Sequence, residues 1–303
     1  MSETRFARLV ALAAPGVFVV LWATGFIGAR MTTPYAEPMI LLVIRFVLAG
    51  AVLFAIALAM RSAWPKGLRA FGHVAVAGLL IQAIYLGGVF AAIRLGLEAG
   101  VSALIVGVQP IVTAALAGPV LGERVGIVKW AGLALGALGV VLVVEQKLAA
   151  GLGTPAAVAL CILSLFAIAV GTLYQKRFCA EQPIVTATIV QYGASAVFCL
   201  GLSFAFETRV VHWSGEMLLG LAWLALVLSC GAVTLLYWLL RKGAAANVAS
   251  LFFMIPPCAA LMGWALFGET MNAVALVGMA LAVAGVAIVN REGRRAAAVP
   301  PPR

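Results

Sequence analysis

Aromatic and amide side chains are the groups best suited to bind a solute within the long apolar runs of this sequence. Trp22 and Phe26 lie four residues apart, and Gln82 and Tyr85 lie three apart, so each pair falls near one face of a helix. Tyr237 is a further candidate, although tyrosine also concentrates where helices leave a membrane. An apolar surface with a few hydrogen-bonding groups is typical of a pocket for a hydrophobic small molecule.

Acidic side chains are absent from the interior of the apolar runs. The chain has no aspartate, and its ten glutamates lie at the ends of these runs or between them. A site inside a membrane that recognises a cation or takes up a proton usually needs a buried carboxylate. The sequence therefore disfavours a cationic solute and carboxylate-based proton coupling, and it leaves a neutral, zwitterionic or anionic solute.

The cysteines and histidines form no pattern that would support catalysis or metal binding. The five cysteines show no CxxC spacing, and His73 and His212 both lie at the ends of apolar runs. We expect no metal ion, no cofactor and no enzymatic activity. A polytopic membrane enzyme is the weaker alternative, because the acid and base groups of an active site are missing.

Arg45 is charged and lies well inside an apolar run, as does Lys129 near the start of another. Seven residues after Pro38, Arg45 stands about 10 Å along the helix from its end. Its guanidinium could pair with a carboxylate of a solute, extend toward the surface, or donate to carbonyls of neighbouring helices. We favour a structural or gating role, because Gln191 occupies the matching position of the repeat described below.

The composition places the chain among all-α integral membrane proteins. Of its 303 residues, 65% are apolar and only 10% are charged, and the mean hydropathy is +1.15. A helix that crosses about 30 Å of hydrocarbon needs roughly 20 apolar residues. Ten runs meet this length, and they are predicted at 9–30, 38–60, 71–93, 99–121, 125–144, 153–174, 184–206, 216–240, 245–267 and 270–290.

The basic residues are distributed unevenly between the two sides of the membrane. With the amino terminus in the cytoplasm, fifteen of the 20 lysines and arginines fall on the inner side. The positive-inside rule then predicts that both termini are cytoplasmic. A net charge of +10 that follows this pattern is explained by membrane topology, so we expect no nucleic-acid partner and expect the lipid bilayer as the main contact.

The two halves of the chain repeat each other. Residues 94–110 align with 241–257, and Gly122-Glu123 falls on Gly268-Glu269 after one deleted residue. Because each half has five predicted spans, the second copy enters the membrane from the opposite side. The predicted organisation is a first repeat at 1–147, an inverted second repeat at 148–290 and a disordered basic tail at 291–303.

The inverted repeat and its paired prolines indicate a transporter. Residues 107–110 (GVQP) and 254–257 (MIPP) lie at the centres of the fourth and ninth predicted spans. A proline removes a backbone hydrogen bond and can free a carbonyl toward a cavity. Alternating-access transporters place their substrate near the midplane, at interrupted helices between inverted repeats. An ordinary kink is the alternative for either motif alone.

The ordered set of motifs resembles the drug/metabolite transporter superfamily, EamA branch. The segment LWATGFIGAR lies near the start of the chain, at the end of the first predicted span, IRFVLAG lies in the second, and each repeat contains GE followed by a glycine-rich helix. The resemblance covers almost the whole chain. Within this branch, the chain is most similar to aromatic amino-acid exporters of the YddG type. It implies a ten-helix exporter of small metabolites in the cell inner membrane, with amino acids as the substrate class. Other metabolites or drugs, such as nucleotide sugars, nucleosides or quaternary amines, are the alternative.

The resemblance also implies which helices surround a central cavity and so completes the set of candidates. The expected substrate-binding residues are Trp22, Phe26, Gln82, Tyr85, Gln109, Pro110, Ser229, Tyr237, Phe252 and Pro256. Arg45, Glu123 and Glu269 are expected to act in gating or structure, with each glutamate in the first turn of the following helix, where the helix dipole stabilises a carboxylate.

Small residues on the fifth and tenth spans indicate close helix packing. Gly132, Gly136 and Gly139 form a stripe, and Gly278 and Gly285 repeat it. Such a stripe lets two helices approach closely, either within the bundle or across a homodimer. Both alternatives remain open at the level of the sequence.

Overall fold

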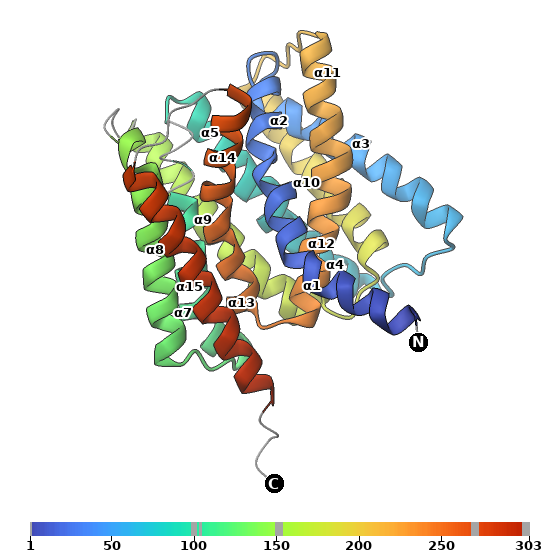
Figure 1. Cartoon of the computed structure of the whole chain (residues 1–303). Helices are drawn as coiled ribbons and strands as arrows, with labels where there is room; N and C mark the ends of the chain where they lie inside the picture. Colours follow the sequence, from blue (N-terminus) through green and yellow to red (C-terminus); the bar gives the residue numbers. More distant parts are fainter. Residues whose placement is uncertain (1, 98–101, 103–104, 149–153, 268–272, 299–303) are drawn as a thin grey trace.

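The computed structural model describes residues 2–97, 102, 105–148, 154–267 and 273–298. These residues form a bundle of helices without a β-strand, and one isolated bridge joins Ala36 to Val211. The all-α prediction is therefore confirmed for the described part of the chain. The start of α1 at Ser2 and the end of α15 at Ala298 lie at the same end of the bundle, which we call the terminal end (Figure 1).

The first half of the chain contains seven α-helices and one π-helical segment in its described part. Its first predicted span is broken at Thr24, and Pro38 begins the next long helix at a position where proline costs no hydrogen bond. The elements are α1 (Ser2–Ala23), α2 (Gly25–Thr32), α3 (Pro38–Ala59), α4 (Leu68–Gly78), η1 (Leu79–Ile84), α5 (Tyr85–Arg94), α7 (Gln109–Leu121) and α8 (Ile127–Leu148).

The second half follows the same order of helices. Thr154 caps its first helix, since the Thr154 hydroxyl accepts a hydrogen bond from the Ala157 N–H. The elements are α9 (Pro155–Cys179), α10 (Ile184–Phe206), α11 (Gly215–Ala222), the π-helical η2 (Trp223–Ala232), α12 (Val233–Lys242), α13 (Ala245–Ser250), the 3₁₀ segment η3 (Leu251–Met254), α14 (Ile255–Phe267) and α15 (Ala273–Ala298).

Six helical segments of the described chain are long and apolar enough to cross a membrane, and four shorter apolar helices accompany them. The long segments are Pro38–Ala59, Leu68–Arg94, Pro155–Cys179, Ile184–Phe206, Gly215–Lys242 and Ala273–Arg291. The shorter ones are Ala13–Ala23, Ile105–Leu121, Ile127–Leu142 and Ala245–Cys258. Each of the ten overlaps one span predicted from the sequence, and together they show a multi-pass membrane protein.

The structure departs from the sequence-based expectation in two places outside the spans. Helix α15 continues to Ala298, through most of the segment predicted to be disordered, because REGRRAAA at 291–298 consists largely of strong helix formers. Glu123 does not lie in the first turn of α8, which begins only at Ile127. Gly122 ends α7 in a left-handed conformation with φ of 70°, and the chain then turns away before α8 begins.

The small-residue stripes of α8 and α15 face each other within this chain. A Cβ atom added at Gly139 would lie 2.5 Å from the Ala282 nitrogen, and one at Gly285 would lie 2.5 Å from the Gly136 nitrogen. The two backbones therefore approach as closely as glycine permits. This contact joins the last helices of the two halves side by side (Figure 1). Whether the chain also forms a homodimer stays a prediction.

Other contacts between the halves are related by the repeat. Helix α3 packs on α10, and the first helices of each half pack on the π-helical segment of the other half. Gly25 allows Leu228 to approach, since an added Cβ would lie 2.6 Å from the Leu228 side chain. Gly171, the matching residue of the second half, makes room for Ile81 in the same way, since an added Cβ would lie 2.7 Å from the Ile81 side chain. The halves thus exchange equivalent contacts.

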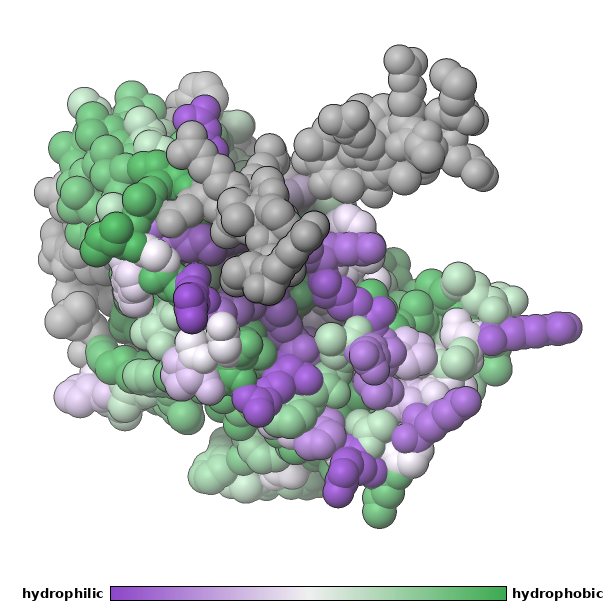
Figure 2. Space-filling model, turned by 90° about the horizontal axis from the view of Figure 1, so that it is seen from below, coloured by the Kyte–Doolittle hydropathy of each residue, from purple (hydrophilic) through white to green (hydrophobic). Residues whose placement is uncertain are grey.

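The terminal end of the bundle is strongly hydrophilic. Figure 2 shows hydrophilic residues gathered across this face, with hydrophobic residues toward its rim. The exposed basic residues of the segments that reach it are Arg61, Lys66, Arg69, Arg124, Arg177, Arg241, Lys242 and Arg291. The helix flanks instead expose large apolar side chains such as Val197 and Phe204, which suits a surface covered by lipid.

Candidate functional site

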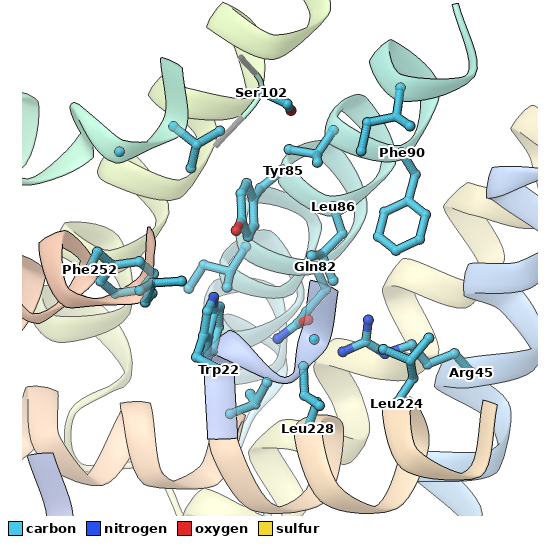
Figure 3. Close-up of a pocket in the computed structure, with 18 of the residues that line it drawn as sticks. Trp22, Arg45, Gln82, Tyr85, Leu86, Phe90, Ser102, Leu224, Leu228 and Phe252 are labelled. Carbon is cyan, nitrogen blue, oxygen red and sulfur yellow. The ribbon is translucent and has the colours of Figure 1, made fainter. Parts of the chain in front are cut away.

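A cavity lies inside the bundle, in the half away from the termini. Its volume is about 100 Å³, which is room for several waters or a small solute. It extends from Gln82 along α5 to Ile93, one residue before that helix ends. Its lining is mostly apolar, and its polar or charged side chains are Trp22, Arg45, Gln82, Tyr85 and Ser102 (Figure 3).

Irregular helices position the lining. The π-helical segments η1 and η2 occupy matching positions in the two halves, since an offset of 147 residues carries 79–84 into 223–232. A π-helical turn inserts extra backbone and changes the direction of the side chains that follow it, and such turns are frequent at functional sites. Gln82 lies in η1, and Leu224 and Leu228 lie in η2. Both segments therefore contribute to the cavity wall.

The two proline-containing spans are also interrupted at matching positions. The chain turns at Val108, directly before Gln109-Pro110 begins α7. In the second half, the 3₁₀ segment η3 precedes Ile255, and α14 then begins with two prolines. The predicted helix interruptions are confirmed. Val106 and Gly107 line the cavity just before the first interruption, and Phe252, Ile255 and Pro256 line it at the second.

An aromatic cluster borders the cavity on one side. Phe18, Trp22 and Phe252 contact one another with ring centroids 5.2 to 5.5 Å apart, and none of the three pairs is stacked face to face. Such tilted and edge-to-face contacts are favourable for aromatic rings. Tyr85 stands on the same side of the cavity as Trp22 and Phe252 (Figure 3). This wall could contact a flat apolar group of a solute.

Arg45 lies on another wall of the cavity, apart from the aromatic side (Figure 3). The residue is 3% exposed, and its Nε donates to the Ser229 Oγ at 2.8 Å. The Ser229 hydroxyl in turn donates to the Leu224 carbonyl at 3.0 Å, across the π-helical turn. The Tyr192 hydroxyl donates to the Ser229 carbonyl at 2.6 Å. Helix η2 therefore holds the arginine through one serine.

Gln82 connects the cavity to the packed region on its terminal side. Its Nε2 donates to the Tyr237 hydroxyl at 3.2 Å, and both side chains are buried. Tyr237 does not line the cavity but supports Gln82 from behind. The pair joins the π-helical turn of the first half to α12 of the second half, so it could respond to relative movement of the halves.

A polar cluster joins the two halves at the terminal end. The Glu123 carboxylate contacts the Lys176 Nζ at 2.8 Å and accepts from the Ala245 N–H at 3.1 Å. Lys176 also donates to the Gly243 carbonyl, and Arg177 donates to the Val120 carbonyl. Glu123 thus caps a helix as expected, but the helix is α13 of the other half and not the one that follows it in the chain.

The residues predicted to bind substrate divide into those that line the cavity and those that do not. Gln109 and Pro110 are buried outside the lining, and Ser229 and Tyr237 touch lining residues from behind. The Phe26 side chain and Glu269 lie outside the described parts of the chain. The predicted residues that line the cavity are Trp22, Gln82, Tyr85, Phe252 and Pro256.

Several residues that line the cavity were not predicted from the sequence. They include Leu86, Val89, Phe90 and Ile93, which form the wall along α5. Ser102 also lines the cavity, in the upper part of the view in Figure 3. An apolar residue facing a cavity carries no sequence signal that separates it from one facing lipid. The spacing of Leu86, Val89, Phe90 and Ile93 is helical and would mark one face once Gln82 and Tyr85 were accepted as lining.

The sequence profile of the EamA-like transporter family matches residues 11–145 and 155–291. The two matched segments together cover most of the chain, one in each half. A crystal structure of a protein with 21% sequence identity covers 93% of this chain and 97% of that protein, with a TM-score of 0.79. This likeness shows the same overall fold.

Three relatives illustrate the range of similar proteins. An uncharacterized inner membrane transporter of Escherichia coli K12, YedA, is 25% identical over 94% of this chain and 92% of its own length. A probable amino-acid metabolite efflux pump of Salmonella typhimurium LT2 is 27% identical over 89% and 91%. A probable terminal-alkyne amino-acid exporter of Streptantibioticus cattleyicolor is 31% identical over 68% and 69%.

Proposed function

The chain belongs to the EamA-like transporter family, and on that premise we propose that it exports hydrophobic or aromatic amino acids and similar small metabolites by alternating access. It is a multi-pass protein of the cell inner membrane. Its family is one of transporters and not of enzymes. The observation that carries the proposal is the cavity between the halves, which combines an aromatic wall with a few polar groups.

The amino-acid class is supported by the character of the cavity and by two relatives. Trp22, Tyr85 and Phe252 present aromatic surface to a solute, while Gln82 and Arg45 offer hydrogen-bond donors. Two relatives carry names that refer to amino-acid export or efflux, at 27% and 31% identity. Proteins with similar folds transport different substrates. The character of the cavity therefore indicates the class of substrate, and transport assays must identify the compound.

We further propose ten membrane spans with both termini in the cytoplasm, as two inverted repeats of five. The basic residues of the terminal end support this orientation, since they outnumber those of the opposite end. The terminal end is then cytoplasmic, and the half of the bundle that contains the cavity faces outward. In this arrangement the polar cluster around Glu123 and Lys176 closes the cytoplasmic side.

The transport step is proposed to be facilitative. No aspartate exists in the chain, and no acidic side chain is among the described residues that line the cavity. A proton-coupled carrier of the usual kind would need such a group near its substrate. Purified protein in liposomes should therefore move substrate down its own gradient without an imposed pH gradient.

A liposome uptake screen tests the proposal. Saturable uptake of phenylalanine, tryptophan, tyrosine or leucine is expected, with lysine, nucleosides, nucleotide sugars and quaternary amines excluded. Replacing Trp22 by alanine should weaken the uptake roughly threefold to tenfold, since aromatic contacts of this kind contribute about 1 kcal/mol. Phe166→Ala is the control, because Phe166 is half exposed on the outer flank of the bundle. Uptake confined to nucleotide sugars or amines would overturn the amino-acid assignment.

A further inference from the structure

Arg45 is a buried cation whose charge has no acidic partner in the described structure. It is 3% exposed, and its recorded hydrogen bond is the one from Nε to the Ser229 hydroxyl. None of the described glutamates forms an ion pair with it. Proteins rarely bury a charge without pairing it, because the charged group loses its hydration.

The two terminal amino groups of Arg45 are free to face the cavity. Within the described residues they donate to no protein acceptor. They are also not fully enclosed by protein, since they are absent from the completely buried polar atoms that have no hydrogen-bond partner. The residue lines the cavity, and Figure 3 shows its guanidinium directed toward Gln82 and the cavity interior. The remaining donors of the guanidinium fork therefore point into the space where a solute would lie.

The rest of the lining offers no second charge. The described lining residues include no glutamate and no basic residue other than Arg45. Lys129 is the other buried cation of the described chain, and it does not line the cavity. The site thus combines one positive charge with an aromatic and aliphatic wall. A solute with a carboxylate at one end and an apolar group at the other complements both features.

We infer that Arg45 binds the carboxylate of the substrate and that the site selects hydrophobic monocarboxylates, with the ammonium group of an amino acid not required. This inference rests on the proposed function and deepens it. A planar carboxylate matches the two free donors of the guanidinium, and charge-assisted bonds of this kind are among the strongest in proteins. An amine without a carboxylate would bring a second positive charge beside Arg45.

The test compares the binding of four related compounds to the purified protein by calorimetry in detergent. They are phenylalanine, 3-phenylpropionate, phenylalanine amide and phenethylamine. The two carboxylates should bind, with 3-phenylpropionate at least as tightly as phenylalanine. The amide and the amine should bind at least tenfold more weakly, in line with the loss of charge-assisted hydrogen bonds. This comparison uses only the unaltered chain, so it holds even where a variant fails to fold.

Variants complete the test. Arg45→Gln should weaken both carboxylates at least tenfold and remove the preference over the amine, while Lys129→Gln should leave the affinities unchanged. Equal binding of amine and carboxylate by the unaltered chain, with Arg45→Gln also without effect, would overturn the inference but leave amino-acid transport intact. Absence of both binding and uptake for all four compounds would instead overturn the proposed function, and the inference with it.

Discussion

The polar side chains around the cavity depend on backbone irregularity for their placement. Ser229 can serve Arg45 because η2 is π-helical, and its hydroxyl bonds to the Leu224 carbonyl five residues earlier. Gln82 lies in the matching π-helical turn and reaches Tyr237. The lining of the cavity is mostly apolar, and these two turns supply directed side-chain hydrogen bonds at its wall. Small changes in either turn would redirect the polar groups that line the cavity.

Glu37 provides a second residue-scale case, at the end of the bundle opposite the termini. Its carboxylate accepts from the Arg94 guanidinium at 3.0 Å, from the Thr208 hydroxyl at 2.8 Å and from the Arg209 N–H at 2.9 Å. Burial would raise the pKa of Glu37, but the hydrogen bonds from Thr208 and Arg209 and the charge of Arg94 outweigh it. The pKa of Glu37 is therefore lowered from its ordinary value of 4.5.

Glu37 should make stability depend on pH in acid. Because the pKa is lowered in the folded chain, the unfolded chain takes up the proton first as pH falls, and the stabilisation is lost as pH drops through the folded-state pKa, below 4.5. Melting temperatures in detergent between pH 6 and pH 3 should fall less steeply for Glu37→Gln than for the unaltered chain. Glu216→Gln, which removes another carboxylate at the same end of the bundle as Glu37, is the control. Parallel curves for Glu37→Gln and the unaltered chain would contradict this account.

At the scale of elements, the pairing of α8 with α15 fixes the two halves to each other. Gly139→Ala should destabilise the protein by about 1–3 kcal/mol, because the new methyl group would fall 2.5 Å from the Ala282 backbone. Gly201→Ala on α10 is a matched control, since nothing lies within 4 Å of a Cβ there. Thermal melts of both variants in detergent measure the difference. An unchanged melting temperature for Gly139→Ala would show that α8 and α15 can separate freely.

The cluster of α7, α9 and α13 at the terminal end is the element that should open during transport. Glu123→Gln weakens its contact with Lys176, so a thiol reagent added from the cytoplasmic side should reach Thr113→Cys in the core of α7 about tenfold faster. Labelling rates in inverted vesicles of a cysteine-free background measure this change. Glu181→Gln, an exposed carboxylate at the same end, should have no effect. Equal rates in all three backgrounds would argue against a gate at this cluster.

Across the whole molecule, length and hydropathy could predict where helices lie but not which faces meet. The ten apolar runs and the matched prolines correspond to helices and interruptions in the structure, because both follow from local composition. The sequence could not show that Gln82 lines the cavity and Gln109 does not, since both are amides in broken or bent helices. No amino-acid composition distinguishes the π-helical turn that places Gln82 at the cavity from an ordinary α-helix. The turn depends on packing against α9 and α10.

The arrangement of charge could be predicted in part. The excess of basic residues predicted which sequence segments share a side, and Figure 2 shows hydrophilic residues gathered on the terminal end. The partner of Glu123 could not be predicted, because Lys176 and Ala245 lie in the other half of the chain and come close only through the packing of α7 on α9 and α13. Long-range contacts of this kind depend on the tertiary fold and leave no local pattern.

Labelling of single cysteines shows whether the cavity opens to the outside and holds the substrate. In a cysteine-free background, Val89→Cys in the cavity wall and Thr113→Cys in the terminal half are exposed in turn to an impermeant thiol reagent outside intact cells. If the substrate cavity faces outward, Val89→Cys is labelled, saturating phenylalanine slows this labelling, and Thr113→Cys is not reached. Labelling of Val89→Cys that phenylalanine does not change, or faster labelling of Thr113→Cys from outside, would contradict an outward-facing substrate cavity.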